Sequence, residues 1–592
     1  MSSLWRKQWR VCPTAPQQLL DCLPELHPLA VQVLYNRHLE RPEEITAFLK
    51  GELVSDNPFL LADMNRAVML IRQAVTDRAP IAVYGDYDVD GITATAIMVQ
   101  TLRSLGADAR PYIPDRFEEG YGLNADAIQA LAKEGVRLMI TVDCGIRSPN
   151  EVAVARSCGM QVVVTDHHHI SGPLPEAEAA INPKRQDSKY PFRDLAGSGV
   201  AYKLAQALLR VNSKTPLRTT VSELSEAELL DLVALGTVAD MVPLLGENHV
   251  LVRQGLEQLN AARRPGMAAL MQTSGAKPGG LTPSTIGYTL GPRLNAAGRM
   301  GDSMVAFDLL MAQDFSTALD LAQKLEQIND QRREDTLKIQ EDARKSLGVE
   351  LDRIGEADAE SKETASEPVQ AGGPPLLFAA SQDFHVGIIG LVAGRLAEEF
   401  YRPAVVVQID EPFSKGSARS IPEFHITQAL DAVADLLVRY GGHEAAAGFT
   451  VRTEYLDTLR ERLMALAKEQ LIGVNLAPSL EADAEVPLEQ LSYDLYHELE
   501  TLTPFGYKNP MPLFIARRVH VLRAVAVGSD GRHLKLSVVG EDGVVWDAIA
   551  FRQGDWFGRL PPLVDLAYHL QQNEWNGKVN LQLNVEDIHP VN

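Results

Sequence analysis

Short apolar runs alternate with helical patterns between residues 80 and 183. The runs Ile81–Tyr84, Leu138–Val142 and 162–165 are each followed by acidic residues. Continuous apolar segments joined by amphipathic helices are typical of a parallel sheet with crossover helices. In such sheets, ligands bind at the carboxyl ends of the strands. The pattern therefore predicts an α/β domain whose functional site lies at these strand ends.

The pattern changes downstream of this domain. Residues 302–347 are polar, with apolar residues at helical spacing, which predicts one or two long helices joining two lobes. Residues 356–375 are small and polar, which predicts a disordered linker or insertion. A second α/β pattern then covers residues 374–474.

Closely spaced alternating segments begin at about residue 480 and are typical of a small β-barrel of the OB type. An Asn576-Gly577 pair predicts a hairpin turn. The predicted strands of the barrel are 519–527, 533–539, 544–551 and 578–585. The predicted domains are an N-terminal segment (1–60), a first α/β domain (61–300), connecting helices (301–350), a linker (351–375), a second α/β domain (376–475) and the barrel (476–592).

Three aspartates follow the first apolar strand at alternate positions: Asp86, Asp88 and Asp90. Alternate side chains of an extended segment share one face, so these carboxylates can converge on a cation. The alternatives are an acidic turn and a calcium loop. An EF-hand loop that began at Asp86 would need a glutamate at its twelfth position, where this chain has Ile97.

The next two strands also end in groups that bind metals. Asp143 follows the second strand, and Asp166 with histidines 167–169 follows the third. A lone aspartate at a strand end is more often a helix cap, but the coincidence at three neighbouring strands favours a metal site. Carboxylates with one or two imidazoles suit Mn²⁺ or Mg²⁺, and the chain has no CxxC pair that would indicate zinc.

Asp240 is the only acidic group in an apolar helical stretch at 235–243. A buried carboxylate is costly unless it is paired or coordinated, so Asp240 is a further candidate ligand. The alternative is a surface residue at the C-terminus of a helix.

The composition of the chain bears on whether its partner is a nucleic acid and on its cellular compartment. The net charge of −22 argues at first against a nucleic-acid partner, because Lys and Arg normally neutralise the phosphates. A metal site needs clustered carboxylates, however, and bound cations reverse the local field. The four cysteines indicate no disulfide framework, and there is no signal-peptide pattern and no apolar run near 18 residues. We expect a cytoplasmic monomer that does not contact membranes.

These pieces, in this order, resemble the DHH phosphoesterase superfamily, whose name matches Asp166-His167-His168. The resemblance implies a parallel-sheet DHH domain joined by a long helix to a second α/β, DHH-associated domain, followed here by an OB-like β-barrel. It also implies two divalent cations, Mn²⁺ or Mg²⁺. The implied ligands are Asp88 and Asp143 for one cation, and Asp90, Asp143, His167 and Asp240 for the other.

The same resemblance bears on four further positions. His168 matches the histidine that contacts the scissile phosphate, whereas His169 has no counterpart and is interpreted as structural. Some relatives have a histidine ligand four residues before Asp88, where this chain has Tyr84. Asp86 is therefore an additional candidate ligand of the first cation.

Segments 113–122, 291–299, 385–395 and 441–449 resemble the branch of the superfamily that degrades single-stranded DNA. The resemblance implies 5′-to-3′ release of mononucleotides in recombination and repair, with single-strand-binding protein and a helicase as candidate partners. The candidate substrate-binding residues are Arg116, Arg299, Ser417, Arg419, Gly441, Gly442 and His443. The arginines could equally form surface salt bridges, and the Gly-Gly-His segment could be a plain turn.

Aromatic side chains of the chain are candidates for stacking on bases. These are Tyr121, Phe505, Trp546 and Trp575, and the alternative for each is a place in a core. Rival functions are a DHH phosphodiesterase for short oligonucleotides, cyclic dinucleotides or pyrophosphate, and a catalytically silent replication scaffold.

Overall fold

The computed structural model of the protein describes residues 7–53, 55–116, 119–120, 122–361, 373–575 and 577–591. The chain divides into two compact units, and each is described by itself. The parallel-sheet unit comprises Leu39–Gln331 and Glu500–Met511, and the barrel unit comprises Met1–His38, Arg332–Leu499 and Pro512–Asn592. Among the described residues, no helix is both long and apolar enough to cross a membrane.

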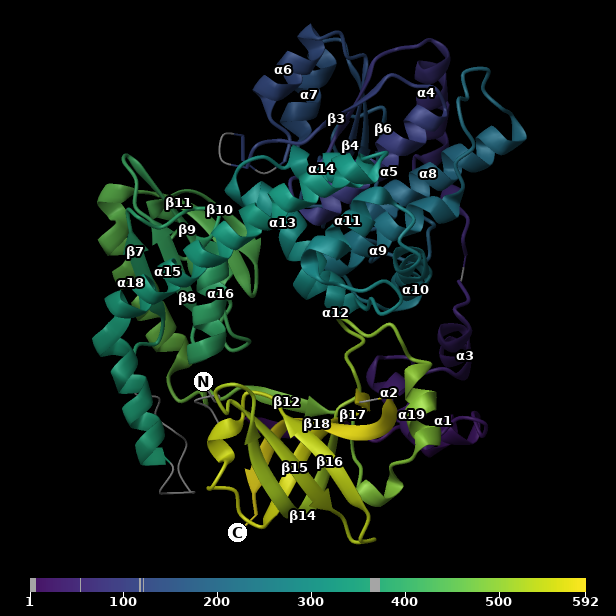
Figure 1. Cartoon of the computed structure of the whole chain (residues 1–592). Coiled ribbons are helices and arrows are strands. Elements are labelled where there is room, and N and C mark those ends of the chain that lie inside the picture. The colour runs from purple at the N-terminus through teal and green to yellow at the C-terminus, as the bar shows by residue number, and fades with distance from the viewer. Residues whose placement is uncertain are drawn as a thin grey trace. The chain divides into compact units, whose positions relative to one another are not determined.

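The first sheet is parallel throughout, as predicted, with strand order β3-β2-β4-β5-β6. Alternate residues of β4 face opposite sides, so Leu138 and Ile140 join one core and Met139 joins the other. Helices α4, α5 and α8 cover the first face, and α6 and α7 cover the second (Figure 1). The strands are β2 (Ile81–Tyr84), β3 (Ala109–Tyr112), β4 (Leu138–Val142), β5 (Gln161–Thr165) and β6 (Ala179–Ile181).

The helices of this unit surround the sheet and continue into an all-helical part. A π-helical turn, Ile286–Leu290, precedes α13. The helices are α3 (Pro42–Lys50), α4 (Met64–Thr76), α5 (Val89–Ser104), α6 (Ala125–Lys133), α7 (Pro149–Ser157), α8 (Gly197–Lys214), α9 (Leu230–Ala239), α10 (Gly246–Asn260), α11 (Pro265–Ser274), α12 (Pro283–Thr285), α13 (Gly291–Met300) and α14 (Met304–Met311).

The predicted long helix is α15, Phe315–Ser361. It extends into the range predicted as a linker, because the stretch up to Ser361 is rich in Glu and Ala, which favour helix. Residues 362–372 of the predicted linker lie outside the described residues.

The second α/β region forms a mixed sheet with strand order β10-β11-β9-β8-β7. Its strands β7 and β8 are parallel, and the remaining pairs are antiparallel. The elements are β7 (Leu377–Ser381), α16 (Ile389–Phe400), β8 (Ala404–Gln408), β9 (Phe413–Arg419), α17 (Ile426–Asp431), β10 (Leu437–His443), β11 (Ala446–Arg452) and α18 (Leu456–Leu471).

The C-terminal strands form the predicted barrel, which is closed by pairing of β14 with β17. Strand β17 was not predicted, since its second half is rich in Gln, Asn and Glu and gives little apolar alternation. It pairs with β18 around the predicted hairpin, although Asn576 itself lies outside the described residues. The strands are β12 (Ser479–Ala482), β13 (Ala484–Glu485), β14 (Phe514–Val527), β15 (His533–Val539), β16 (Val545–Ala550), β17 (Leu563–Trp575) and β18 (Lys578–Pro590).

The N-terminal segment belongs to the barrel unit up to His38. Its strand β1 (Gln8–Val11) pairs in parallel with β12, and helices α1 (Gln17–Asp21) and α2 (Pro28–Asn36) follow. Arg37 forms a buried ion pair with Asp483, which fixes this segment to the start of the barrel.

A buried ion pair joins α8 to α10 in the parallel-sheet unit. The Lys203 ammonium is fully buried and contacts Glu247, which also accepts a hydrogen bond from the Tyr190 hydroxyl (2.7 Å). We expect Lys203→Met to lower the free energy of unfolding of this unit by about 3–5 kcal/mol, because it leaves a buried carboxylate uncompensated. Denaturant titration with fluorescence or circular dichroism detection measures the change.

The double variant Lys203→Met/Glu247→Gln is the control, because glutamine keeps an acceptor for Tyr190 and carries no charge. It should recover most of the lost stability. An equal loss in both variants would contradict the electrostatic explanation.

Candidate metal centre

Three loops at the carboxyl edge of the parallel sheet carry the acidic and imidazole side chains. Asp86 and Asp88 follow β2, Asp143 follows β4, and the histidines follow β5. Asp88 caps α5 by accepting a hydrogen bond from the Gly91 N–H (3.0 Å). The apolar strands therefore deliver these polar residues to one edge, as the sequence predicts.

The N-terminus of α8 holds Asp90. The N–H groups of Gly197 and Ser198 donate to its two carboxylate oxygens at 2.6 and 2.9 Å. Exposed N–H groups at the start of a helix favour negative charge. A Cβ on Gly236 of α9 would lie 2.5 Å from Asp90 Oδ1, so a larger residue there would displace the carboxylate.

Asp143 has a left-handed backbone, with φ of 62°. Aspartate adopts this conformation more readily than most residues, but it is unfavourable and is often found at functional sites. A Cβ on Gly197 would lie 2.4 Å from Asp143 Oδ1. Glycine at the start of α8 therefore lets the helix approach both Asp90 and Asp143.

Asp166 organises the histidine loop. It accepts hydrogen bonds from the N–H groups of His167 (2.7 Å) and His168 (2.9 Å), and its Oδ1 lies 2.7 Å from His168 Nδ1. Burial raises the pKa of Asp166, but its contacts with His168 outweigh burial and lower the pKa to about 2. Asp166 is therefore an anion that orients His168.

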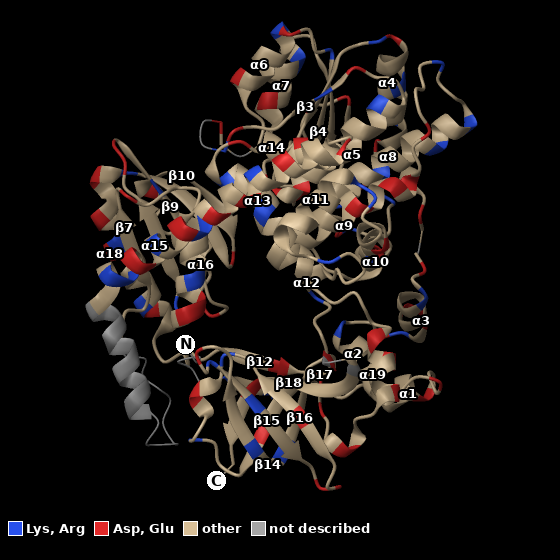
Figure 2. Ribbon diagram, in the orientation of Figure 1, with Lys and Arg blue, Asp and Glu red and all other residues tan. Residues whose placement is uncertain are grey.

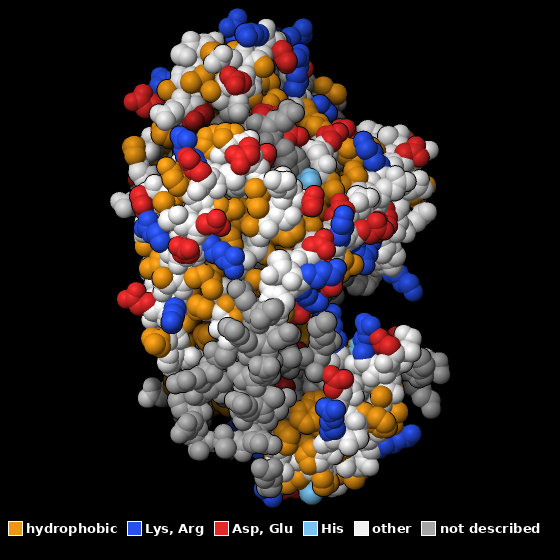
Figure 3. Space-filling model, turned by 90° about the vertical axis from the view of Figure 1, so that its left-hand side faces the viewer, with side chains coloured by type: hydrophobic (Ala, Val, Ile, Leu, Met, Phe, Trp, Pro, Cys, Tyr) orange, Lys and Arg blue, Asp and Glu red, His pale blue; other side chains and the backbone are white. Residues whose placement is uncertain are grey.

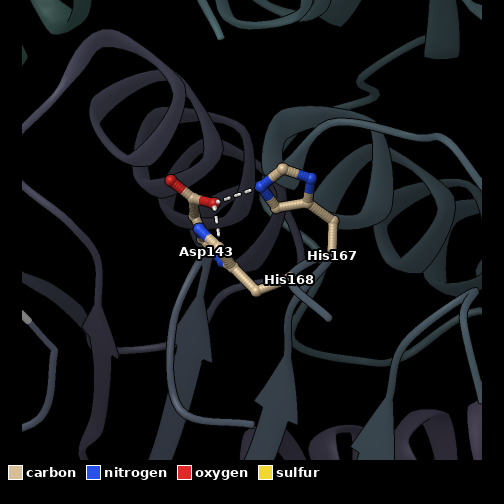
Figure 4. Close-up of side chains that lie close together, drawn as sticks. All are labelled: Asp143, His167 and His168. Carbon is tan, nitrogen blue, oxygen red and sulfur yellow. Dashed lines mark ion pairs between the residues drawn. The ribbon is translucent and has the colours of Figure 1, made fainter. Parts of the chain in front are cut away.

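The side chains meet in three overlapping groups whose ligand atoms lie within 4.8 Å of one another. His167 Nε2 lies 3.2 Å and His168 Nδ1 lies 4.0 Å from Asp143 Oδ1 (Figure 4). His167 Nε2 also lies 3.6 Å from Asp240 Oδ2. The groups are Asp86, Asp88 and Asp143; Asp90, His167 and Asp240; and Asp143, His167 and His168.

The cluster fits divalent cations by the chemistry of its donors. Asp143 Oδ1 and both ring nitrogens of His167 are buried without a hydrogen-bond partner among the described residues. Buried polar atoms are rarely left unsatisfied. Carboxylate oxygens with imidazole suit Mn²⁺ or Mg²⁺, and a cation would satisfy these atoms together.

Burial and mutual repulsion shift the pKa values of the cluster. Burial, followed by repulsion from neighbouring aspartates, raises the pKa of Asp86, Asp88 and Asp143. The same causes raise the pKa of Asp240 to about 9. Burial lowers the pKa of His167 to about 4, so its ring is neutral at pH 7 and can act as a ligand.

Asp240 has features of both interpretations of the sequence, a residue at the C-terminus of a helix and a candidate ligand. It lies at the C-terminus of α9, and its side chain is 24% exposed. It nevertheless turns toward His167 and lies in the same group as Asp90. Tyr84 turns away from the cluster, because its hydroxyl donates to the Gly122 carbonyl (3.3 Å) and accepts from the Asn124 N–H (3.2 Å).

Arg116 and Arg299 both lie near Tyr87, beside the loop after β2. The Arg116 guanidinium is 5.1 Å from the centre of the Tyr87 ring, and its charge lowers the pKa of buried Asp86 against the larger effect of burial. Arg299 lies on α13, which carries two arginines, Arg293 and Arg299 (Figure 2). A Cβ on Gly298 would lie 2.5 Å from the Tyr87 carbonyl, so α13 touches this loop closely.

The sequence prediction missed the backbone donors of Gly197 and Ser198. A signal was present in the Gly197-Ser-Gly199 segment, which begins α8 without an acidic or proline residue. Such a start leaves N–H groups available for an anion. What the sequence lacked was any indication that this anion would be Asp90.

The remaining substrate-binding candidates share one sheet of the barrel unit. Register places Gly441 opposite Gly448 and Gly448 opposite Ser417, while His443 and Arg419 both pair with Ala446. Aligned residues of adjacent strands share a face, so these four candidates line one side of the sheet. Gly442 faces the other way, where a Cβ would lie 2.3 Å from the Ala446 carbonyl.

Of the four aromatic candidates for base stacking, the structure describes the side chains of two. Phe505 and Trp546 are half-buried, and Trp546 Nε1 has no hydrogen-bond partner among the described residues. Tyr121 and the Trp575 side chain lie outside the described residues. On the face shown in Figure 3, acidic and basic side chains are interspersed, so the net charge is not gathered into one patch there.

Three family models match the chain: the DHH family, N-terminal domain, over residues 80–237, the DHHA1 domain over 373–469, and the RecJ OB domain over 482–587. The chain is 37% identical to the single-stranded-DNA-specific exonuclease RecJ of Dickeya dadantii, covering 99% of both, and 35% identical to that of Bacillus subtilis, covering 98% of this chain and 71% of the relative. A crystal structure of Thermus thermophilus RecJ with Mn²⁺ aligns with a TM-score of 0.80 and 29% identity, over 99% of this chain and 80% of that one.

Cation binding to this cluster should depend on pH through Asp240. In the folded metal-free protein the pKa of Asp240 is about 9, which is above the ordinary value of 3.8. The protonated carboxyl group therefore makes its whole contribution to folding stability below pH 3.8, and this contribution is lost as the pH rises to 9. We expect Mn²⁺ to bind more tightly as pH rises over this range and to release protons. Titration calorimetry in buffers of different ionisation enthalpy measures both effects.

Asp240→Asn should remove part of the proton release, whereas Asp126→Asn, at an exposed site on α6, should leave it unchanged. An Mn²⁺ affinity that is independent of pH would show that Asp240 is not a ligand.

Proposed function

The chain belongs to the RecJ family of single-stranded-DNA-specific exonucleases, and on that premise we propose that it degrades single-stranded DNA from the 5′ end to mononucleotides, in recombination and repair. The observation that carries the proposal is the buried cluster in which Asp143 and His167 each belong to two ligand groups. The candidate partners of this activity are a helicase, which would supply unwound strands, and a single-strand-binding protein, which would hold them.

Divalent cations bound at the cluster would activate water for attack on the phosphodiester and stabilise the charge of the leaving oxygen. We assign their ligands to Asp86, Asp88, Asp90, Asp143, His167 and Asp240. Asp143 serves both sides of the cluster, because its carboxylate lies within reach of Asp86 and Asp88 as well as His167.

His168 is the proposed phosphate contact. The Asp166 carboxylate binds its Nδ1 and fixes the ring. The ring would then contact the phosphate or the leaving oxygen through Nε2. Arg116 and Arg299 lie near Tyr87, beside the loop after β2, and would hold neighbouring phosphates by charge-assisted hydrogen bonds.

Ser417, Arg419, Gly441, Gly442 and His443 are proposed to bind the strand in the DHHA1 domain. Three of them offer polar or charged side chains on one side of the sheet, and glycine at 441 leaves the backbone accessible to a phosphate. The barrel would hold the strand farther from the cleaved end.

Asp143→Asn should lower the rate of single-strand hydrolysis by more than about 100-fold, since even residues that merely support a metal ligand typically contribute 10- to 100-fold. Binding of single-stranded DNA, measured by fluorescence anisotropy, should stay close to that of the unchanged protein. Asp126→Asn is the control and should keep full activity. Full nuclease activity in Asp143→Asn would refute the assignment of the site.

A substrate panel tests specificity and direction. Long single strands labelled at the 5′ or the 3′ end are digested with Mn²⁺ beside duplex DNA, dinucleotides and pyrophosphate. We expect release of the 5′ label first, as a mononucleotide, and little cleavage of the duplex. Preference for dinucleotides or pyrophosphate would favour a small-substrate phosphodiesterase, and DNA binding without any hydrolysis would favour a scaffold.

A further inference from the structure

A segment from far downstream packs against the loop that follows Asp240. Residues Glu500–Met511 lie between α19 (Tyr493–Glu500) and β14, yet they belong to the parallel-sheet unit. We call this segment the plug. It contacts the loop 241–245, which connects α9 to α10 and begins directly after the proposed ligand.

The plug and the loop are joined by specific contacts. The Leu244 N–H donates to the Tyr507 carbonyl at 2.8 Å. A Cβ on Gly506 would lie only 2.4 Å from Leu244 Cδ1, so the plug backbone is packed directly on this side chain. At the start of α10, His249 Nε2 lies 3.3 Å from the Leu502 carbonyl.

The plug is a closed turn that keeps its own shape. The fully buried Asn509 donates from Nδ2 to the carbonyls of Leu502 (3.1 Å) and Pro504 (3.0 Å). The backbones of Gly506 and Asn509 also exchange two hydrogen bonds, of 2.8 and 3.1 Å. These hydrogen bonds therefore hold the Tyr507 carbonyl in a fixed position.

The loop that the plug contacts is conformationally strained where it leaves Asp240. Met241 has φ of 58° and is 64% exposed, so its own side chain contributes little packing to hold this conformation. A left-handed residue with a Cβ persists only where its surroundings hold it. Asn248 Nδ2 donates to the Pro243 carbonyl at 3.0 Å, and the plug contacts the loop at the next residue, Leu244.

We propose that the plug is a positioning element for Asp240, holding loop 241–245 so that the Asp240 carboxylate stays beside Asp90 and His167. The inference rests on the proposed cation site. It gives a segment within the range matched by the RecJ OB model a role in cation binding, which the ligand positions alone do not indicate.

Gly506→Ala in the full chain tests the proposal, because its methyl group would push Leu244 and the loop away from the plug. Gly280→Ala is the matched control, since a Cβ there meets only the Lys277 carbonyl, at 3.8 Å. Titration calorimetry of the metal-free protein with Mn²⁺ is the main readout. Circular dichroism and thermal melting without metal report on folding.

We expect Gly506→Ala to weaken Mn²⁺ binding about 10-fold while the protein stays folded, and Gly280→Ala to leave it unchanged. Asp240→Ala is measured alone and combined with Gly506→Ala. If the plug acts through Asp240, Gly506→Ala should cause no further loss of affinity in the Asp240→Ala background.

The outcomes separate the two hypotheses. If Asp240→Ala weakens Mn²⁺ binding but folded Gly506→Ala does not, the positioning role is wrong and the cation site stands. If the two losses add in the double variant, the plug acts elsewhere and the proposal is wrong. If Asp240→Ala leaves the affinity unchanged, both the ligand assignment and the positioning role fail. Should Gly506→Ala not fold, Leu244→Ala, which removes the side chain that the plug packs against and adds no charge, gives the same comparison.

Discussion

The repulsion among buried carboxylates at one edge of a parallel sheet is the constraint on which the rest of the structure depends. Asp86, Asp90 and Asp143 are almost completely buried, and Asp88 and Asp240 lie against them. Removing charges from water is costly, and like charges add to that cost. Burial and repulsion together raise the pKa values of four of these groups. A fold that retains such a cluster must contain features that compensate for it.

The backbone supplies much of this compensation. Asp90 receives two N–H donors from the start of α8, and Asp88 receives one from α5. These donors are available because a parallel sheet with crossover helices places helix N-termini at the same edge as the strand C-termini. Cations would complete the compensation at Asp143 and His167, because Asp143 Oδ1 and the ring nitrogens of His167 have no hydrogen-bond partner among the described residues. The same burial that makes a cluster of carboxylates unfavourable by itself would favour divalent cations in it.

Local sequence was sufficient to predict three of the five strands of the parallel sheet, β2, β4 and β5, and the residues that they carry to its edge. The short strands β3 and β6 were not predicted. Period and apolarity defined β2 and β4, and a polar residue that follows such a strand has only one edge to occupy. Close approaches between distant segments were not predictable in this way. Gly197 and Gly236 matter because of what a Cβ would strike, and the atoms that it would strike belong to residues far away in sequence. Strand β17 was missed for a related reason: its pairing with β14 and β18 stabilises a polar sequence that has little strand signal of its own.

The plug shows the same limit at the level of domains. From the sequence, residues 500–511 lie within the range 476–592 that was predicted for the barrel. In the structure they pack with the loop 241–245 and with α10, so the unit that holds the carboxylate cluster is not continuous in sequence. All proposed ligands precede residue 241, yet the loop that sets the position of the last one is held by residues about 260 positions later. A complete set of ligands is therefore not the same as a complete site. The geometry of the cluster depends on long-range packing that a catalogue of ligand motifs does not contain.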